Sequence, residues 1–349
     1  MSASICLIQG DGIGPEITQA TQMVLQRLAP DLDIVHAQAG LSALEQHGTL
    51  LPEETLQRIA GADATLKGPL TTPVGEGFSS INVALRRHFD LYANVRPVRS
   101  VPGTRVRYQG LDIITVRENT EGAYLNEGQF LSDDGQRAES RIVITRKGSE
   151  RVIRHAFELA RAQGRQKVTL VHKANILKTT SGLFLKCGRE IAEHYPDIQF
   201  EEMIVDNACM QLVLNPERFD VIVTTNLFGD ILSDLCAGLV GGLGMAPGAN
   251  IGQQAAIFEA VHGSAPDIAG QGIANPAALM LAASMMLDHL GRTPCANQLR
   301  QAIHATIRQG DRITPDLGGS GTTLDFTQAV LDRIPMGQDA KPQPLPRMA

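Results

Sequence analysis

The chain has 349 residues, of which 43% are hydrophobic, and its formal net charge at pH 7 is -6. This length allows about two domains with hydrophobic cores of their own, and the negative charge argues against nucleic acid or an anionic membrane as a partner. No apolar run approaches the roughly 20 residues needed to cross a bilayer, and residues 1–8 lack the features of a secretory signal, so we expect a cytoplasmic protein.

A strand, a glycine-rich loop and a helix are predicted at the start of the chain. Residues 5–9 form an apolar run typical of a strand, and residues 17–28 have helical periodicity. The loop between them spells G-x-G-x-G followed by proline, which departs from the dinucleotide fingerprint and is a weak nucleotide signal. β-branched runs recur at residues 168–172 and 221–225, each followed by helix-compatible sequence, so we predict an α/β fold with parallel strands.

Short polar side chains and arginines gather in and after residues 78–87, which read FSSINVALRR. The residues concerned are Ser80, Asn82, Arg86, Arg96 and Arg117. An arginine fork matches a carboxylate two bonds at a time, so several arginines together predict a clamp for a substrate with more than one carboxylate. The alternative is that each arginine lies on a solvated face or pairs with a nearby acid.

Three further segments stand outside the alternating pattern. Residues 129–145 contain two extended runs around an Asp-Asp-Gly turn, which predicts a hairpin or arm that needs a partner. The glycine-rich residues 238–248 indicate a tightly packed crossing or a hinge between domains. Residues 336–349 contain three prolines and predict a flexible tail.

Two side chains are candidates for proton transfer. Tyr124 follows the run Arg117–Gly122 and carries a hydroxyl that suits a proton donor, although packing is the commoner role of a tyrosine. Lys173 ends a predicted strand. A lysine can act as a base where a neighbouring metal ion and partial desolvation favour its neutral form, and otherwise it pairs with an anion.

Asp230 and Asp234 follow the predicted strand at residues 221–225, and their i, i+4 spacing places both carboxylates on one face of a helix. Carboxylates without nearby His or Cys ligands suit a hard divalent cation, and Asp206 is a plausible third ligand. The five cysteines are scattered and indicate no thiolate site. The alternative is a helix cap for Asp230 and a solvated Asp234.

The loop at residues 259–270 is a second nucleotide candidate, because its small residues would let backbone amides approach a phosphate. Asp267 could accept hydrogen bonds from a ribose diol and repel a 2′-phosphate. An ordinary turn with His262 satisfied locally is the alternative.

Taken together, these segments resemble the β-decarboxylating dehydrogenase family, which includes isocitrate, 3-isopropylmalate, homoisocitrate and tartrate dehydrogenases. The match runs from about residue 5 to 335. The segments that resemble the family are 10–16 (GDGIGPE), 67–73 (KGPLTTP), 94–97 (NVRP), 116–119 (VREN), 226–230 (NLFGD) and 262–267 (HGSAPD).

The resemblance implies a two-domain α/β fold of the isopropylmalate/isocitrate dehydrogenase type with a clasp arm, distinct from the usual dinucleotide-binding fold. It implies a large domain from residues 1–97 and 250–335 and a small domain from residues 98–249, with an arm at about 125–145. It also implies a homodimer with shared active sites, in which Lys173 and Asp206 come from the opposite subunit to Asp230 and Asp234; assembly beyond the dimer stays open.

The resemblance also implies roles for individual residues. Tyr124 and Lys173 would be catalytic, and Asp206, Asp230 and Asp234 would hold Mg²⁺ or Mn²⁺. The substrate-binding residues would be Thr72, Ser80, Asn82, Arg86, Arg96 and Arg117. The cofactor-binding residues would be Asn175, Glu259, His262, Gly263, Ser264, Ala265, Pro266, Asp267, Ile268 and Asn275.

Within the family, the pattern Ser80-x-Asn82 is similar to that of isocitrate enzymes, where both residues meet the extra carboxylate, and Asp267-Ile268 is similar to that of NAD-using members. The implied activity is NAD-dependent oxidative decarboxylation of isocitrate to 2-oxoglutarate and CO2, as in the tricarboxylic acid cycle. Homoisocitrate or 3-isopropylmalate dehydrogenase is the alternative, and a regulatory subunit without catalysis is another.

Overall fold

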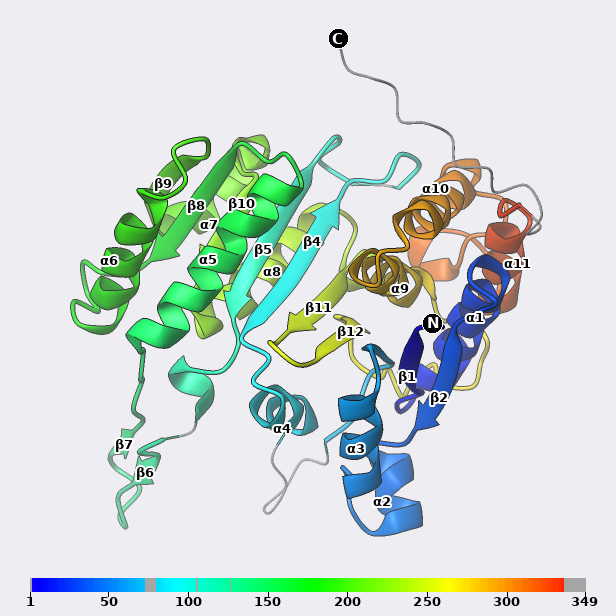
Figure 1. Ribbon diagram of the computed structural model, residues 1–349, viewed down its shortest axis with the longest axis horizontal. Helices are drawn as coiled ribbons and strands as arrows, with labels where there is room; N and C mark the ends of the chain where they lie inside the picture. Colours follow the sequence, from blue (N-terminus) through cyan, green and yellow to red (C-terminus); the bar gives the residue numbers. More distant parts are fainter. Residues whose placement is uncertain (1, 73–79, 105, 126, 336–349) are drawn as a thin grey trace. The chain divides into compact units, whose positions relative to one another are not determined.

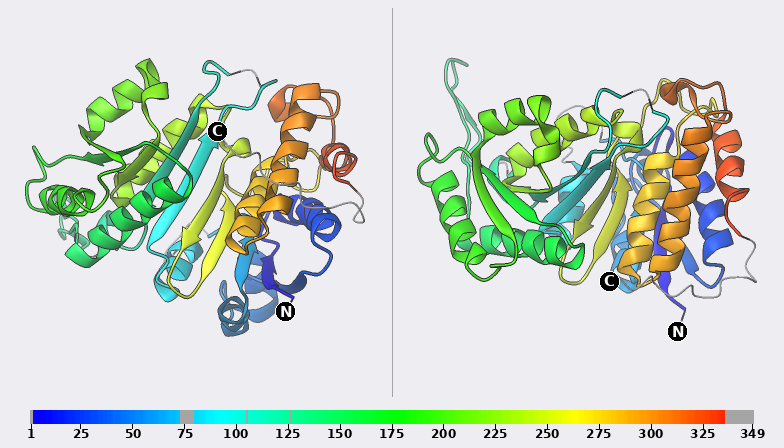
Figure 2. Two further views of the ribbon diagram at one scale, coloured as in Figure 1. Left: turned by 45° about the horizontal axis from the view of Figure 1, so that its top comes forward. Right: turned by 90° about the horizontal axis from the view of Figure 1, so that it is seen from above.

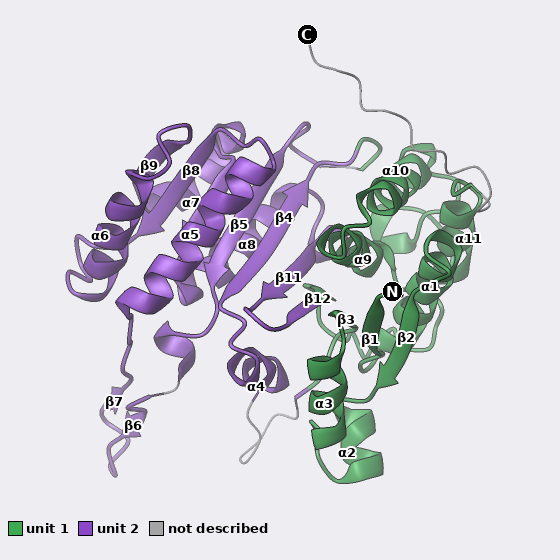
Figure 3. Cartoon of the chain, viewed as in Figure 1, with its two compact units in different colours: residues 1–71, 102–104, 258–349 green, residues 72–101, 105–257 purple. Residues whose placement is uncertain are grey.

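A computed structural model describes residues 2–72, 80–104, 106–125 and 127–335 (Figure 1). The chain divides into two compact units, which Figure 3 shows in different colours. Unit 1 comprises Met1–Thr71, Pro102–Thr104 and Phe258–Ala349, and unit 2 comprises Thr72–Val101 and Arg105–Ile257. Unit 1 is thus built from both ends of the chain. Compared with the implied domains, residues 72–97 and 250–257 belong to unit 2 and residues 102–104 belong to unit 1. The predicted tail, residues 336–349, lies outside the described part.

Unit 1 contains a sheet with the strand order β2, β1, β3, β12, in which β1 pairs in parallel with both β2 and β3. The strands are β1 (Ser4–Ile8), β2 (Asp33–Ala37), β3 (Ala64–Lys67) and β12 (Ala256–Ala260), whose first two residues belong to unit 2. The helices are α1 (Gly14–Leu28), α2 (Leu41–His47), α3 (Glu53–Gly61), α9 (Ala277–His289), α10 (Thr293–Gln309) and α11 (Thr323–Leu331). The predicted first strand and first helix are therefore confirmed.

Helix α9 is the central helix of unit 1. Its sequence, AALMLAASMMLDH, is apolar on nearly every side, and a helix of that composition is stable only when surrounded by protein. α1 and α10 both contact it, and α10 lies beside it in both views of Figure 2. α11 begins with a capping box in which Thr322 and Asp325 each accept the other's backbone N–H.

Unit 2 contains strands in the order β11, β4, β5, β10, β8, β9; β4 runs antiparallel to β5 and β11, and the last four strands run parallel. The strands are β4 (Ala93–Arg99), β5 (Asp112–Glu118), β8 (Lys167–His172), β9 (Gln199–Ile204), β10 (Val221–Thr224) and β11 (Pro247–Ile251). The helices are α4 (Ile81–His88), α5 (Arg146–Ala162), α6 (Thr180–Ala192), α7 (Val205–Leu214) and α8 (Asn226–Leu239). The two predicted β-branched strands are β8 and β10, which pair in parallel.

The helices of unit 2 cover both faces of this sheet, with α5 on one face and α8 on the other (Figure 1). Strands β10 and β8 have no exposed residues, as their near-continuous apolar sequences require in a sheet covered on both sides. The carboxyl ends of β5, β8 and β10 lie at the same edge of the sheet. Ligands of open α/β sheets bind at such an edge.

The predicted hairpin is confirmed. β6 (Phe130–Leu131) and β7 (Ala138–Glu139) pair antiparallel in a two-stranded sheet of their own, and Gly135 turns the chain with a φ of 67°. Phe130 and Leu131 expose their side chains, so the arm presents apolar surface.

The glycine-rich residues 238–248 lie entirely within unit 2. In the described part of the chain, no helix combines the length and apolarity needed to span a membrane.

Candidate functional site

Two aspartates of α8 form one side of the candidate site. α8 begins directly after β10, and Asp230 and Asp234 lie one turn apart on the same helix face. Nη1 of Arg96, on β4, lies 3.8 Å from Oδ1 of Asp230 and 3.2 Å from Oδ1 of Asp234. One guanidinium therefore reaches both carboxylates, which remain partly exposed to solvent.

Arg117, on β5, is buried beneath these carboxylates with only 1% of its surface exposed. Its Nη1 pairs with Asp230, while its Nε and Nη2 donate to Oδ1 of Asn226 at 3.0 and 2.7 Å. Gly229 makes this approach possible, because a Cβ atom there would lie 2.5 Å from Cγ of Arg117. α8 must therefore have a glycine where it crosses the arginine.

Tyr124 lies in a short 3-10 helix, Gly122–Leu125, and its hydroxyl donates to Oδ2 of Asp230 at 2.5 Å. The guanidinium carbon of Arg117 is 4.9 Å from the centre of its ring, a cation–π distance. Burial and the hydrogen bond to Asp230 raise the pKa of Tyr124, which keeps the phenol protonated and able to donate. Burial is the largest single influence on Asp230 and opposes its ionisation, but the charges of Arg117 and Arg96 and the hydrogen bonds from Tyr124 and Arg117 together lower the pKa of that carboxyl.

Lys173 and Asp206 form a second pair. Nζ of Lys173, just after β8, lies 3.0 Å from Oδ2 of Asp206 in the first turn of α7, and this hydrogen bond lowers the pKa of Asp206. Among the described residues of one chain, no three His, Cys, Asp or Glu side chains gather to hold a metal ion. Asp230 and Asp234 nevertheless fit a hard cation, because they supply carboxylate oxygens on one face and no softer ligands. Asp206 does not join them within one chain.

Of the remaining predicted substrate residues, Ser80 and Asn82 lie at the start of α4, Arg86 lies in its last turn, and Thr72 precedes the helix. Ser80 caps the helix by accepting from the backbone N–H of Val83, and Thr72 accepts from the N–H of Ile81 at 3.3 Å. Oδ1 of Asn82 is buried with no hydrogen-bond partner among the described residues. Arg86 is 9% exposed. Phe78 and Ser79, in the segment that motivated the clamp prediction, lie outside the described residues.

All predicted cofactor residues except Asn175 lie in unit 1. Ala265 has a φ of 38°, a strained value for a residue with a side chain, and Nε2 of His262 is buried without a partner among the described residues. Burial lowers the pKa of His262, so the ring is held neutral. An unpaired buried polar atom in a tight loop of small residues fits a bound nucleotide. Asn275 donates to Asp316 at 2.9 Å, while Asn175 is exposed in unit 2.

The glycine-rich loop after β1 packs directly against this cofactor loop. The N–H of Ile13 donates to the carbonyl of Ser264 at 2.9 Å, and a Cβ atom at Gly12 would lie 2.0 Å from that carbonyl oxygen. Gly12 also has a φ of 59°. A glycine is therefore required at position 12, because another part of the backbone passes so close to it. This packing role accounts for a glycine-rich motif that resembles a dinucleotide-binding fingerprint without matching it.

Sequence reasoning missed two groups of buried polar residues. Lys67 forms a buried ion pair of 2.7 Å with Glu259, a predicted cofactor residue. Asn94, Asn226 and Asn250 connect the arginines to the rest of unit 2. Lys67, Asn94 and Asn226 lie inside recognised motifs, so their positions were a signal. Their partners Glu259, Asn250 and Arg117 are too distant in the chain to be deduced.

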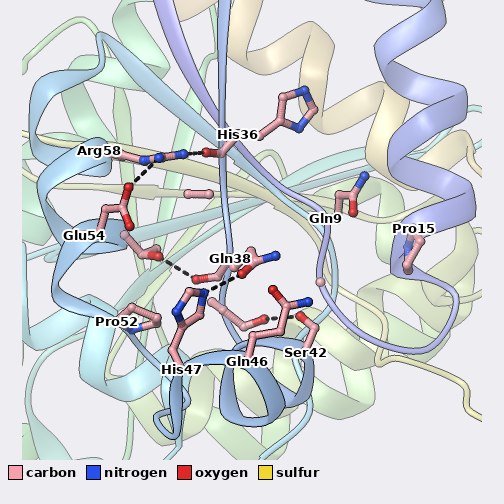
Figure 4. A pocket seen from close by; sticks show the side chains of 14 residues that line it. Gln9, Pro15, His36, Gln38, Ser42, Gln46, His47, Pro52, Glu54 and Arg58 are labelled. Carbon is pink, nitrogen blue, oxygen red and sulfur yellow. Dashed lines mark hydrogen bonds and ion pairs between the residues drawn. The ribbon is translucent and has the colours of Figure 1, made fainter.

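A cavity of about 470 Å³ in unit 1 lies outside the predicted site (Figure 4). It is lined by the ends of β1 and β2 and by α2 and α3. Arg58, in the wall of the cavity, forms an ion pair with Glu54 and donates a hydrogen bond to the carbonyl of His36. His47 forms a hydrogen bond with Gln38 at 2.7 Å. Its polar groups largely satisfy one another.

Comparisons with known proteins agree with this geometry. A family model described as isocitrate/isopropylmalate dehydrogenase matches residues 4–330. The isocitrate/homoisocitrate dehydrogenase of Thermus thermophilus is 50% identical over 338 residues, covering 96% of this chain and 99% of that protein. The 3-isopropylmalate dehydrogenase of Archaeoglobus fulgidus is 50% identical over 326 residues, with 93% and 98% covered.

The catalytic subunit 5 of the mitochondrial NAD isocitrate dehydrogenase of Arabidopsis thaliana is 49% identical over 330 residues, with 94% and 87% covered. Among solved structures, isocitrate dehydrogenase from Methylococcus capsulatus superposes with a TM-score of 0.92 at 53% identity, covering 95% of this chain and 99% of that one. The predicted fold type is thereby confirmed. The chain belongs to the isocitrate/isopropylmalate dehydrogenase family and is a β-decarboxylating dehydrogenase.

Proposed function

We propose that the protein catalyses the NAD-dependent and Mg²⁺- or Mn²⁺-dependent oxidative decarboxylation of isocitrate to 2-oxoglutarate and CO2. The observation that carries the choice of substrate is the position of Asn82 in the first turn of α4, because the NH₂ group of its amide can donate to a carboxylate. Together with Ser80 it puts polar groups, rather than apolar ones, at the start of α4. A third substrate carboxylate suits such a surface, and an isopropyl group does not.

Each residue has a place in this reaction. Arg96 and Arg117 bind the substrate carboxylates, and Asp230, Asp234 and Asp206 hold the cation. When bound, a cation held by these aspartates would supply polarisation of the C2 oxygen, and NAD would supply the hydride acceptor. Lys173 takes the proton of the C2 hydroxyl. After the bond between C3 and its carboxylate breaks, Tyr124 donates a proton to the electron pair left on C3, a role supported by its protonated phenol.

We include in the proposal a homodimer in which Lys173 and Asp206 serve the partner's site. This is supported by the separation of Asp206 from Asp230 and Asp234 within the described chain. It is also supported by apolar side chains that α7 and α8, which contact each other, leave exposed. These are Met210, Val213, Leu214, Leu227 and Ile231. Apolar surface of this kind is typical of a buried subunit interface.

The competing activities are testable with the intact protein. One relative, from Dictyostelium discoideum, is named a regulatory subunit of NAD isocitrate dehydrogenase and is 45% identical over 336 residues. Against a regulatory role stands the presence of Tyr124, Lys173 and the three aspartates in this chain. The other relatives' names cover isocitrate, homoisocitrate and 3-isopropylmalate.

Purified protein with Mg²⁺ is expected to turn over isocitrate with NAD at a higher kcat/KM than homoisocitrate or 3-isopropylmalate, and to prefer NAD to NADP. Spectrophotometry of reduced cofactor measures all six combinations. EDTA should abolish the activity and added Mg²⁺ should restore it. A higher kcat/KM for homoisocitrate or 3-isopropylmalate would identify that acid, instead of isocitrate, as the substrate. No turnover of any of the three acids would favour a regulatory subunit.

Replacing Asn82 with leucine is expected to raise the KM for isocitrate roughly 10-fold or more, because a buried polar contact to a charged group contributes about 1.5–3 kcal/mol. The kcat/KM for 3-isopropylmalate should fall much less or rise. Val83→Ala is the matched control, since it alters the neighbouring α4 position without removing a polar group. Equal losses for both acids would mean that Asn82 does not select between them.

A further inference from the structure

Two buried asparagines hold the two site arginines in the same way. Nε of Arg96 donates to Oδ1 of Asn94 at 2.8 Å, and Nε of Arg117 donates to Oδ1 of Asn226 at 3.0 Å. Asn94 is 0% exposed and Asn226 is 1% exposed. In each case a neutral amide oxygen contacts the Nε edge of a guanidinium whose Nη1 faces the aspartates of α8.

The direction of these hydrogen bonds is fixed by chemistry. A guanidinium only donates, so each asparagine must present its oxygen to the arginine and its NH₂ group elsewhere. Asn226 donates to the carbonyl of Glu121 at 3.0 Å, and Asn94 donates to Oδ1 of Asn250 at 2.7 Å. Each amide is therefore hydrogen-bonded through both its oxygen and its NH₂ group, and this fixes the orientation of the guanidinium that it contacts.

A neutral acceptor and a charged acceptor would have different consequences. A carboxylate at either position would make the same hydrogen bond but would also cancel the positive charge of the arginine, because a buried ion pair is screened little by solvent. An amide orients the guanidinium without adding a further negative charge to the aspartates of α8 that already face its Nη1. Gly229 adds to this arrangement by letting α8 pass against Arg117.

We propose that Asn94 and Asn226 are positioning residues that orient Arg96 and Arg117 for a substrate carboxylate without adding negative charge of their own. The inference rests on the proposed function, in which both arginines bind the hydroxy acid. Neither asparagine touches the substrate in this account. Each acts through the arginine that it holds, so substitutions should weaken substrate binding more than they slow the chemistry.

The test compares Asn226→Ala with Asn226→Asp. Both variants lose the donation to the Glu121 carbonyl, but alanine leaves Arg117 its charge, whereas aspartate keeps the acceptor and adds a competing charge. We expect the KM for isocitrate to rise roughly 10-fold in the alanine variant and roughly 100-fold in the aspartate variant, with kcat changed much less. If Asn226 only holds the start of α8 in place, the KM for isocitrate should rise less in the aspartate variant than in the alanine variant.

Asn94→Ala and Asn94→Asp repeat the comparison at Arg96. If the variants at one asparagine fail to fold, those at the other still test the inference. Asn297→Asp is the matched control, because exposed Asn297 also accepts from an arginine, Arg300, at 2.7 Å; it should behave as wild type. Stabilisation of each variant by isocitrate with Mg²⁺, measured by thermal unfolding, provides a readout independent of turnover. Aspartate variants that bind isocitrate as tightly as the alanine variants would overturn the inference, whereas inactive wild-type protein would instead overturn the proposed function.

Discussion

Asp230→Asn is expected to lower kcat/KM roughly 1,000-fold or more. The carboxylate of Asp230 accepts from the Tyr124 hydroxyl at 2.5 Å, pairs with Arg117 and is a proposed ligand of the cation. Asparagine has the same shape but lacks the charge. Losing a charged metal ligand costs several kcal/mol of transition-state stabilisation, and each 1.36 kcal/mol is about tenfold in rate. Steady-state kinetics across a Mg²⁺ titration measures the loss and shows whether excess cation recovers part of it.

Asp112→Asn is the control for this prediction. Asp112 is also an arginine-paired aspartate of unit 2, with Oδ1 2.6 Å from Arg165, but it lies at the opposite end of β5 from Arg117. Its replacement should leave kcat/KM within a few fold of wild type. If Asp230→Asn kept a tenth or more of wild-type activity at ordinary Mg²⁺ concentrations, Asp230 would not be an essential ligand.

Lys67→Met is expected to have the largest effect on stability. Nζ of Lys67 lies 2.7 Å from Oε2 of Glu259, and the two side chains are only 3% and 9% exposed. Replacing Lys67 removes the cationic partner of a buried carboxylate, and breaking a buried ion pair in this way lowers the free energy of unfolding by about 3–5 kcal/mol. Urea denaturation followed by circular dichroism measures this difference.

The double variant Lys67→Met/Glu259→Leu should recover much of that loss, because it removes both buried charges. Arg58→Met breaks the exposed pair between Arg58 and Glu54 and should cost at most about 1 kcal/mol. A Lys67→Met variant no less stable than Arg58→Met would show that solvent or another group compensates Glu259.

Local features of the chain were predictable from sequence. The β-branched run that forms β8 and the i, i+4 spacing of Asp230 and Asp234 depend on a few neighbouring residues, and such periodicities are set by backbone geometry. The hairpin at β6 and β7 follows from an Asp-Asp-Gly turn between two extended runs. In each case the signal and the structure lie within the same short stretch.

Contacts between distant segments could not be deduced in this way. Lys67 meets Glu259 because both lie at the ends of strands, β3 and β12, that are neighbours in the sheet of unit 1. Arg117 meets Asn226 because β5 and β10 are neighbours in unit 2. Strand order decides both pairs, and no local pattern in one sequence encodes it. The resemblance to a family supplied the roles of many residues, but it did not identify these partners.

The discontinuity of unit 1 has a consequence for its biogenesis. Ribosomal synthesis delivers β1, β2 and β3 within the first 71 residues, but α9, which packs against β3 and α1, comes only after residue 276. All of unit 2 is made in between. Unit 2 can therefore complete its fold on the ribosome while the N-terminal strands still lack the helix that covers them. The apolar surface of β1 and β3 stays uncovered until residues 258–349 of unit 1 are made.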